Sequence, residues 1–137
     1  MSEQRFFVVD FRTKWTRQPY ITLWGPNHSG YNWSLSNAGR YTAQQLDANV
    51  GYTTNRRYVP SRGKRCGPWE RFGVPCEVME RLASEPDTEG RWRLDNGGGP
   101  IVRNSAAVRE LLTANRYVPK PPSEADRSSG EKEIRNG

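Results

Sequence analysis

The chain has 137 residues, a length that fits one domain with a core of its own. It is polar, with 34% hydrophobic residues and a mean hydropathy of −0.94, although five Trp can supply much of a small core. These values exclude a protein built around a long apolar span, since the apolar run at Phe6–Val9 is far too short for a membrane helix or a signal peptide. We therefore expect a soluble, intracellular protein with no membrane partner.

The positive charge is concentrated in one half of the chain. The formal net charge is +6, yet residues 11–67 alone carry nine Lys and Arg against the single acid Asp47. Such an asymmetry favours an acidic partner, which could be nucleic acid, a nucleotide or an acidic protein face. The alternative interpretation is a solvated basic surface that only keeps the protein in solution.

Three strands are expected in the first third of the chain. Phe6–Phe11 is rich in Phe and Val, and a polar loop or turn over Thr13–Pro19 separates it from a second strand at Tyr20–Trp24. Tyr31–Leu35 alternates aromatic or apolar with polar residues and predicts a third strand. The loop Gly25–Gly30 has turn residues at both ends, so we expect it to close a hairpin. Together these segments predict a three-stranded antiparallel meander.

Two or three short helices are expected to cover this sheet. Thr42 and Gln45 form a capping-box pattern before a helix at Ala43–Asn49. A second helix is expected to begin at Pro75, and a third covers Ser105–Ala114. The second and third helices carry apolar residues at helical spacing, namely Val78, Met79 and Leu82 and then Val108, Leu111 and Leu112.

The remaining segments are predicted to lack long regular elements. Residues 51–73 are dense in Arg, Gly and Pro and are expected to be irregular, and Ser84–Gly90 is expected to be an acidic loop. Trp92–Leu94 predicts a short strand that ends at the Gly-rich turn 96–100. The overall expectation is one α+β domain over residues 1–118, followed by a disordered tail over residues 119–137. Exposed edges of so small a sheet also favour a homodimer.

No group of residues in the sequence forms a catalytic or metal-binding pattern. His28 is the only histidine, so no Ser or Cys has a second histidine to activate it. Cys66 and Cys76 match neither a zinc-binding pair nor a disulfide framework, and we expect both to be reduced. We therefore predict a protein that is not an enzyme and that needs no cofactor or metal.

A basic run with interleaved aromatic residues is the strongest candidate for a binding surface. Cationic side chains neutralise phosphates and exposed rings can stack on bases, so this combination is typical of nucleic-acid contacts. The alternative is a disordered basic loop whose aromatic residues lie in the core. The predicted surface consists of Tyr52, Arg56, Arg57, Tyr58, Arg62, Lys64, Arg65 and Trp69, with Trp24, His28 and Arg40 as contacts at its rim.

Two segments carry a resemblance to a known group of proteins. ITLWGPNHSGYNWSLSNAGRY at 21–41 and VPCEVMERLA at 74–83 resemble small uncharacterised proteins that bacteriophages and prophages encode. The chain departs from their pattern by a longer basic insertion at Thr53–Gly73. The resemblance implies an accessory phage protein in the cytoplasm of a bacterial host, and such proteins often disarm host defence systems.

Three functions therefore remain open from the sequence. The first is an inhibitor of a host defence system, which resembles an anti-CRISPR protein or sequesters a nucleotide signal and acts through the basic aromatic surface. The second is an accessory protein that binds nucleic acid directly. The third is a small enzyme, which the single histidine disfavours. The expected partners are accordingly a host defence complex, nucleic acid or a nucleotide.

Overall fold

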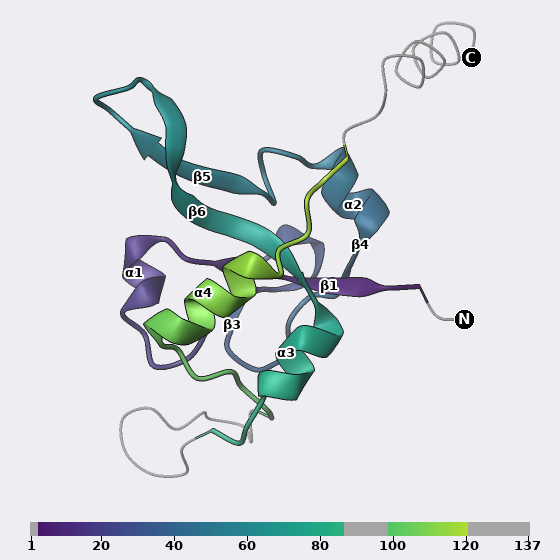
Figure 1. Cartoon of the computed structure of the whole chain (residues 1–137). Coiled ribbons are helices and arrows are strands. Elements are labelled where there is room, and N and C mark those ends of the chain that lie inside the picture. The colour runs from purple at the N-terminus through teal and green to yellow at the C-terminus, as the bar shows by residue number, and fades with distance from the viewer. Residues whose placement is uncertain (1–2, 87–98, 121–137) are drawn as a thin grey trace, which may run out of the picture.

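The apolar run near the N-terminus forms the central strand of the structure. In the computed structural model, which describes residues 3–86 and 99–120, strand β1 spans Arg5–Asp10 (Figure 1). The side chains from Phe6 to Val9 are all buried, so this strand needs cover on both faces of the sheet. It pairs antiparallel with three other strands, which explains why the most continuous apolar segment lies at the centre.

The sheet has six strands, and the predicted number of three was therefore wrong. Its order is β3-β2-β1-β6-β5, and β4 also pairs with β1. The α+β class and the hairpin between the second and third strands are confirmed, since β2 and β3 pair antiparallel around the Gly25–Gly30 loop. The strands beyond β1 are β2 at Leu23–Trp24, β3 at Tyr31–Asn32, β4 at Tyr41–Thr42, β5 at Asn55–Val59 and β6 at Lys64–Pro75.

The expectation of an irregular segment at 51–73 was wrong, because most of this segment forms the β5–β6 hairpin. A four-residue turn, Pro60–Gly63, joins the two strands, and Gly63 takes a left-handed conformation with φ 64°. Its N–H donates to the carbonyl of Val59 at 2.9 Å. Arg, Gly and Pro are weak strand formers, so local propensity hid these strands. The pairing of β6 with β1 over Arg71–Pro75 supplies the stability that propensity does not.

Two predicted strands are shorter than expected, and one predicted loop contains a helix. Tyr20–Trp24 is a ladder strand only at its last two residues, because Ile21 instead donates to the carbonyl of Val102. The strand predicted at Tyr31–Leu35 ends after Asn32, since the Ser34 carbonyl accepts two turn hydrogen bonds. Within the Thr13–Pro19 loop, α1 forms one turn at Thr13–Thr16.

The three predicted helices are confirmed with slightly different ends. Helix α2 spans Ala43–Ala48, and its capping box forms: the Thr42 Oγ1 accepts from the Gln45 N–H at 3.0 Å, and the Gln45 side chain accepts from the Thr42 N–H at 2.8 Å. Helix α3 spans Cys76–Leu82, directly after Pro75. Helix α4 spans Ala106–Ala114, where the Ser105 hydroxyl caps the first turn. A short 3-10 turn, η1, also occupies Pro26–His28 in the hairpin loop.

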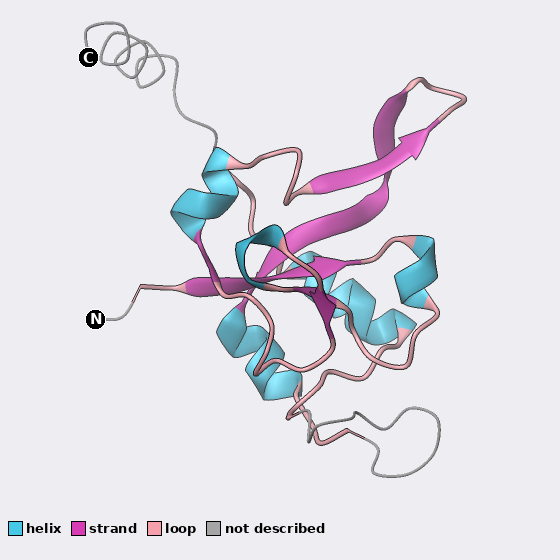
Figure 2. Cartoon of the chain, turned by 180° about the vertical axis from the view of Figure 1, so that it is seen from behind, coloured by secondary structure: helices cyan, strands magenta, loops and turns pink. Residues whose placement is uncertain are grey.

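The helices cover opposite faces of the sheet. Helices α3 and α4 place Met79 and Leu112 on the face that contains Phe72, where the larger core lies. In Figure 1 α4 lies in front of the strands, and in the view from behind the strands lie in front of it (Figure 2). On the other face α2 packs Leu46 so closely that a Cβ at Gly73 would lie 2.6 Å from its Cδ1. Because Gly73 has no side chain, α2 can pack closely against this face of β6.

Several sequence predictions fall on residues that the structure does not describe. The short strand at Trp92–Leu94, most of the Gly-rich turn and residues 121–137 of the tail all lie outside the described ranges. Of the predicted tail, only residues 119–120 are described, and Lys120 donates its backbone N–H to Asp47 at 2.7 Å.

None of the helices found in the described ranges has the length and apolar character needed to cross a bilayer.

Candidate binding arm

The β5–β6 hairpin extends well beyond the rest of the sheet. Only the last part of β6, Arg71–Pro75, pairs with β1, whereas the earlier part pairs with β5 alone. The result is a two-stranded ribbon that projects from the body of the molecule (Figure 1). Register shifts between Asn55 and Tyr58 add twist to this ribbon. We call residues 55–69 the arm.

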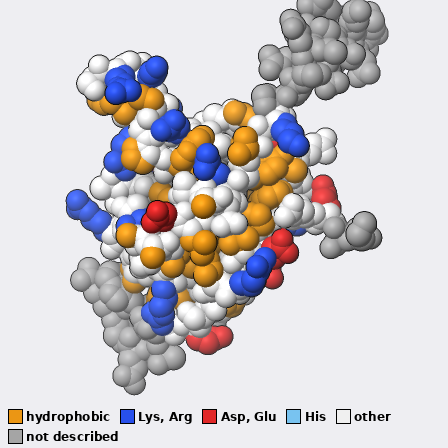
Figure 3. All heavy atoms as spheres, viewed as in Figure 1, with side chains coloured by type: hydrophobic (Ala, Val, Ile, Leu, Met, Phe, Trp, Pro, Cys, Tyr) orange, Lys and Arg blue, Asp and Glu red, His pale blue; other side chains and the backbone are white. Residues whose placement is uncertain are grey.

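The arm has a strong positive charge and no acidic residue. It contains Arg56, Arg57, Arg62, Lys64 and Arg65, and the space-filling view shows Lys and Arg side chains gathered over it (Figure 3). Of these five, only Arg57 has an ion pair within the described ranges, from its Nε to Glu70 Oε2 at 3.0 Å. Its guanidinium also donates to the Thr13 hydroxyl at 3.2 Å. Four cations therefore have no carboxylate partner among the described residues.

Hydrogen bonds across the two strands hold two of the exposed cations of the arm in place. Arg62, Lys64 and Arg65 are exposed near the turn. Arg65 donates to the carbonyl of Arg56 at 3.1 Å, and Arg56 donates through its Nε to the carbonyl of Gly67 at 2.6 Å. These bonds span the two strands and hold the guanidinium groups in place, so the charge is presented by an ordered ribbon and not by a loose chain.

The two aromatic residues of the arm are placed differently. Tyr58 is 49% exposed and faces Arg65 across the strands as its register partner. Trp69 lies at the base of the arm, is half-buried, and packs against the larger core. The guanidinium carbons of Arg56 and Arg116 lie 5.3 Å and 4.7 Å from the centre of its ring. These distances fit cation–π contacts, which fix the ring beneath two charges.

Three other predicted site residues, Trp24, His28 and Tyr52, form a separate aromatic cluster, in which Trp24 belongs to the same core cluster as Leu46 of α2. His28 stacks on Tyr41 at 5.3 Å, and Trp24 and Tyr52 meet the imidazole edge to face. Trp24 is only 4% exposed and donates through Nε1 to Asp10, so little of its ring is open to a ligand. Arg71 connects this cluster to β6, since its guanidinium lies over the rings of Trp24 and Tyr52. The cluster therefore supports the base of the arm.

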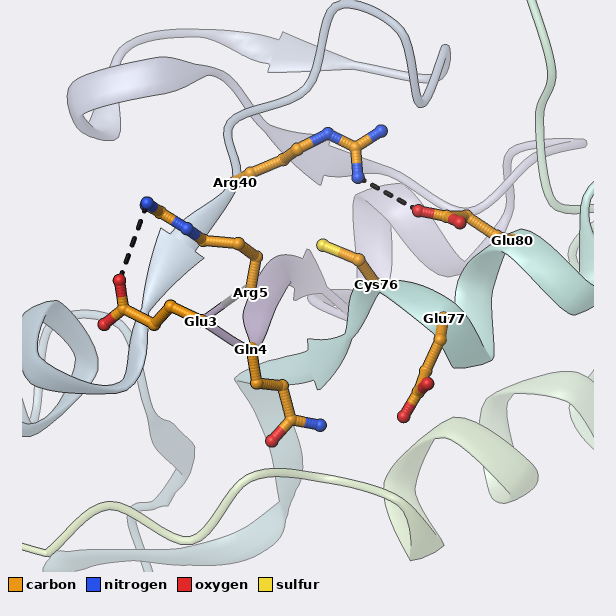
Figure 4. A pocket seen from close by; sticks show the side chains of 7 residues that line it. All are labelled: Glu3, Gln4, Arg5, Arg40, Cys76, Glu77 and Glu80. Atoms are coloured by element: carbon orange, nitrogen blue, oxygen red, sulfur yellow. Dashed lines mark hydrogen bonds and ion pairs between the residues drawn. The ribbon is translucent and has the colours of Figure 1, made fainter. Parts of the chain in front are cut away.

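The last predicted rim residue, Arg40, lies at the opposite end of β6 from the arm. It lines a pocket of about 570 Å³ together with Arg5, Cys76 and three glutamates, Glu3, Glu77 and Glu80 (Figure 4). Arg40 contacts Glu80 at 3.1 Å and Arg5 contacts Glu3 at 3.6 Å. Burial raises the pKa of the Cys76 thiol, although the guanidinium of Arg40 partly opposes this. Cys66 and Cys76 are both free thiols.

Sequence reasoning missed three arginines that the fold brings to the base of the arm. Arg71 follows Trp69 by two residues in β6, and Arg109 and Arg116 come from α4 and its C-terminal side. Arg116 stands in the Arg-Tyr-Val-Pro motif that recurs at 57–60, but the motif alone does not show that its arginine reaches Trp69. Only the packing of α4 beside β6 brings these residues together.

Comparisons with known proteins leave the function to the geometry. No protein-family model matches the chain, and neither a curated protein sequence nor a solved structure matches it. In the part of the chain that the structure describes, no three His, Cys, Asp or Glu side chains gather as metal ligands would.

Proposed function

We propose that the protein binds nucleic acid and that the arm is its phosphate-binding element. The observation that carries this proposal is the projecting ribbon with five cations, four of which have no carboxylate partner within the described ranges. An unpaired cation on an ordered strand can exchange its counterions for phosphates at little conformational cost. A cation that already has a carboxylate partner, such as Arg40 beside Glu80, would have to give up that ion pair before it could bind a phosphate.

The shape of the arm supports the same proposal. The major groove of B-DNA admits a two-stranded β-ribbon, and basic grooves or ribbons also follow single strands. Tyr58 adds an exposed ring between the cations, which could stack on a base or lie against a sugar. An inhibitor of host defence, whether it contacts a protein complex or sequesters a nucleotide signal, stays a prediction from the sequence, and a phosphate-binding arm is compatible with it.

The test compares two variants with the same change in charge. The arm variant replaces Arg62, Lys64 and Arg65 by Gln. These positions are exposed and lie near the turn, so they avoid the Arg57–Glu70 ion pair. The control variant replaces Arg5, Arg81 and Lys120, which are also exposed but lie outside the arm, by Gln. Affinity for a duplex and for a single strand is measured by fluorescence anisotropy over a range of salt concentrations.

We expect the arm variant to lose affinity for the duplex on the order of 100-fold at about 0.15 M salt, because each lost phosphate contact lowers the salt slope for B-DNA by about 0.9. The slope should fall by roughly 3 in the arm variant and change much less in the control. Equal losses of affinity in the two variants would show that binding depends on the net charge of the protein and not on the arm. If the unmodified protein binds neither the duplex nor the single strand, the proposal is refuted.

A further inference from the structure

A second pocket lies directly at the base of the arm. Its volume is about 350 Å³, which falls in the range of small-molecule sites. Phe11 and Pro68 contribute apolar surface, together with the indole of Trp69. Arg109, Glu110 and Thr113 of α4 line the same pocket. A concave site with an aromatic residue therefore continues the basic surface of the arm toward the body of the protein.

The pocket combines apolar lining residues with two cations. Arg57 lines it from the arm and Arg109 lines it from α4. Arg57 contacts Glu70 at 3.0 Å and donates to the Thr13 hydroxyl at 3.2 Å. Arg109 donates to the side chain of Asn104 at 2.5 Å. A guanidinium has five N–H donors, so both can still donate to a ligand while they keep these bonds. The pocket thus suits a flat ring that carries an anionic group.

The ring of Trp69 is held in a fixed position beside this space. It packs against the larger core, and the guanidinium groups of Arg56 and Arg116 lie over it. Arg116 is itself fixed by a bond of 3.0 Å to the carbonyl of Thr113. Aromatic rings and the planes of arginine side chains are the surfaces on which proteins stack unpaired bases. Little side-chain freedom would be lost when a base entered this site.

We infer that the pocket accepts one unpaired nucleobase of a strand whose phosphates lie along the arm. This inference rests on the proposed function, because the arm would deliver the strand to the pocket. A base in a duplex is paired and stacked and cannot enter a concave site unless it leaves the helix. The pocket therefore makes the protein prefer single strands, or duplexes with an unpaired base, over fully paired duplexes. The carboxylate of Glu110 supplies an acceptor for N–H groups at the edge of the base.

The test separates bases from phosphates. Three probes of equal length are compared: a single strand of about 16 nucleotides, the same strand without bases, and the corresponding duplex. The strand without bases keeps every phosphate, so the arm should treat it like the intact strand. We expect the intact strand to bind on the order of 10-fold more tightly than the strand without bases, which is the usual contribution of one stacked base.

Two variants of α4 then locate the effect. Thr113→Phe fills the pocket, whereas Ala114→Phe places the same ring at an exposed neighbouring position that does not line it. The advantage of the intact strand should disappear in Thr113→Phe and persist in Ala114→Phe, while duplex affinity is unchanged in both. Equal folding is verified by urea denaturation.

The outcomes distinguish this inference from the proposed function. If the unmodified protein binds strands with and without bases equally, the pocket does not accept a base, although the arm can still bind phosphates. If the advantage of bases survives in Thr113→Phe, the bases bind elsewhere and the inference is also overturned. If none of the three probes shows salt-dependent binding, the proposed function fails and the inference fails with it.

Discussion

The two ends of β6 carry arginines in opposite electrostatic settings. At the end of the strand that continues into α3, Arg5 and Arg40 share a pocket with three glutamates, and each has a carboxylate partner. At the other end the arm carries five cations, of which only Arg57 is paired within the described ranges. The comparison shows that the number of arginines in a region does not identify a phosphate-binding surface. The pairing of those arginines is what distinguishes the two regions.

Among single substitutions, the largest expected effect comes from giving the arm a carboxylate partner of the kind that Arg5 and Arg40 have at the other end of β6. Tyr58→Glu places a carboxylate opposite Arg65, its register partner, at a separation where cross-strand charges interact. The new carboxylate should both neutralise Arg65 and repel a phosphate. Losing about two phosphate contacts in this way corresponds to an affinity loss for a single strand on the order of 15-fold at about 0.15 M salt.

The matched control is Tyr58→Gln, which removes the same ring without adding charge. Anisotropy titrations with one labelled single strand measure both variants. The Gln variant should lose only what the exposed ring contributes. If the two variants bind equally well, the pairing of charges does not control binding at this position, and the distinction between the two ends of β6 loses its functional meaning.

The arm is also the region whose secondary structure was hardest to predict from the sequence. Arg56, Tyr58 and Arg65, which are neighbours in the predicted surface, do lie together on one ribbon. Their secondary structure was not predicted, because the β6 strand is stabilised by its pairing with β1, which is distant in sequence. The α2 capping box, by contrast, was predictable because all of its bonds are local.

The pocket at the base of the arm could not have been predicted for the same reason. Its lining comes from Phe11, which follows β1, and from α1, β5, β6 and α4, so Phe11 and Arg109 meet only after the chain has folded. The placement of Tyr52 illustrates the converse problem. It is close in sequence to Arg56, but its half-exposed ring packs with Trp24 and His28 instead of lying along the arm. Sequence proximity therefore predicted which cations lie together on the ribbon, but not which aromatic residues lie beside them.

A smaller difference between the two ends of β6 should appear in thiol chemistry. Cys66 is partly exposed on the arm. Cys76 is 7% exposed in the pocket that it shares with Arg5 and Arg40, and burial raises the pKa of its thiol. Alkylation requires an accessible thiolate, so Cys66 should react with iodoacetamide on the order of 10-fold faster near neutral pH.

Peptide mass spectrometry over a time course measures this ratio directly. In urea, where burial is lost, the two rates should converge, which separates the effect of folding from that of neighbouring sequence. A bound single strand should slow alkylation of Cys66 and leave Cys76 unaffected. Faster reaction at Cys76 in the folded protein would contradict the described packing of this end of β6.

The smallest expected effect is an alkaline loss of stability that involves the body of the protein and not the cations of the arm. The hydroxyl of Tyr41 donates to the carbonyl of Gly25 and accepts from the N–H of His28 at 2.9 Å. Burial raises the pKa of this phenol, and the His28 N–H opposes the shift only in part. The folded state therefore favours the neutral phenol, and its contribution to stability is fully present below the ordinary phenol pKa of about 10.

As the pH rises above about 10, the unfolded state releases this proton more readily and the contribution is lost. One group can change the free energy of unfolding by at most about 1.4 kcal/mol per pH unit. Urea midpoints measured between about pH 8 and pH 11 should fall over the upper part of this range. In Tyr41→Phe the fall should be shallower, with a remainder from Tyr117, whose phenol pKa is also raised. An equally steep fall in Tyr41→Phe would show that the buried phenol is not the group responsible.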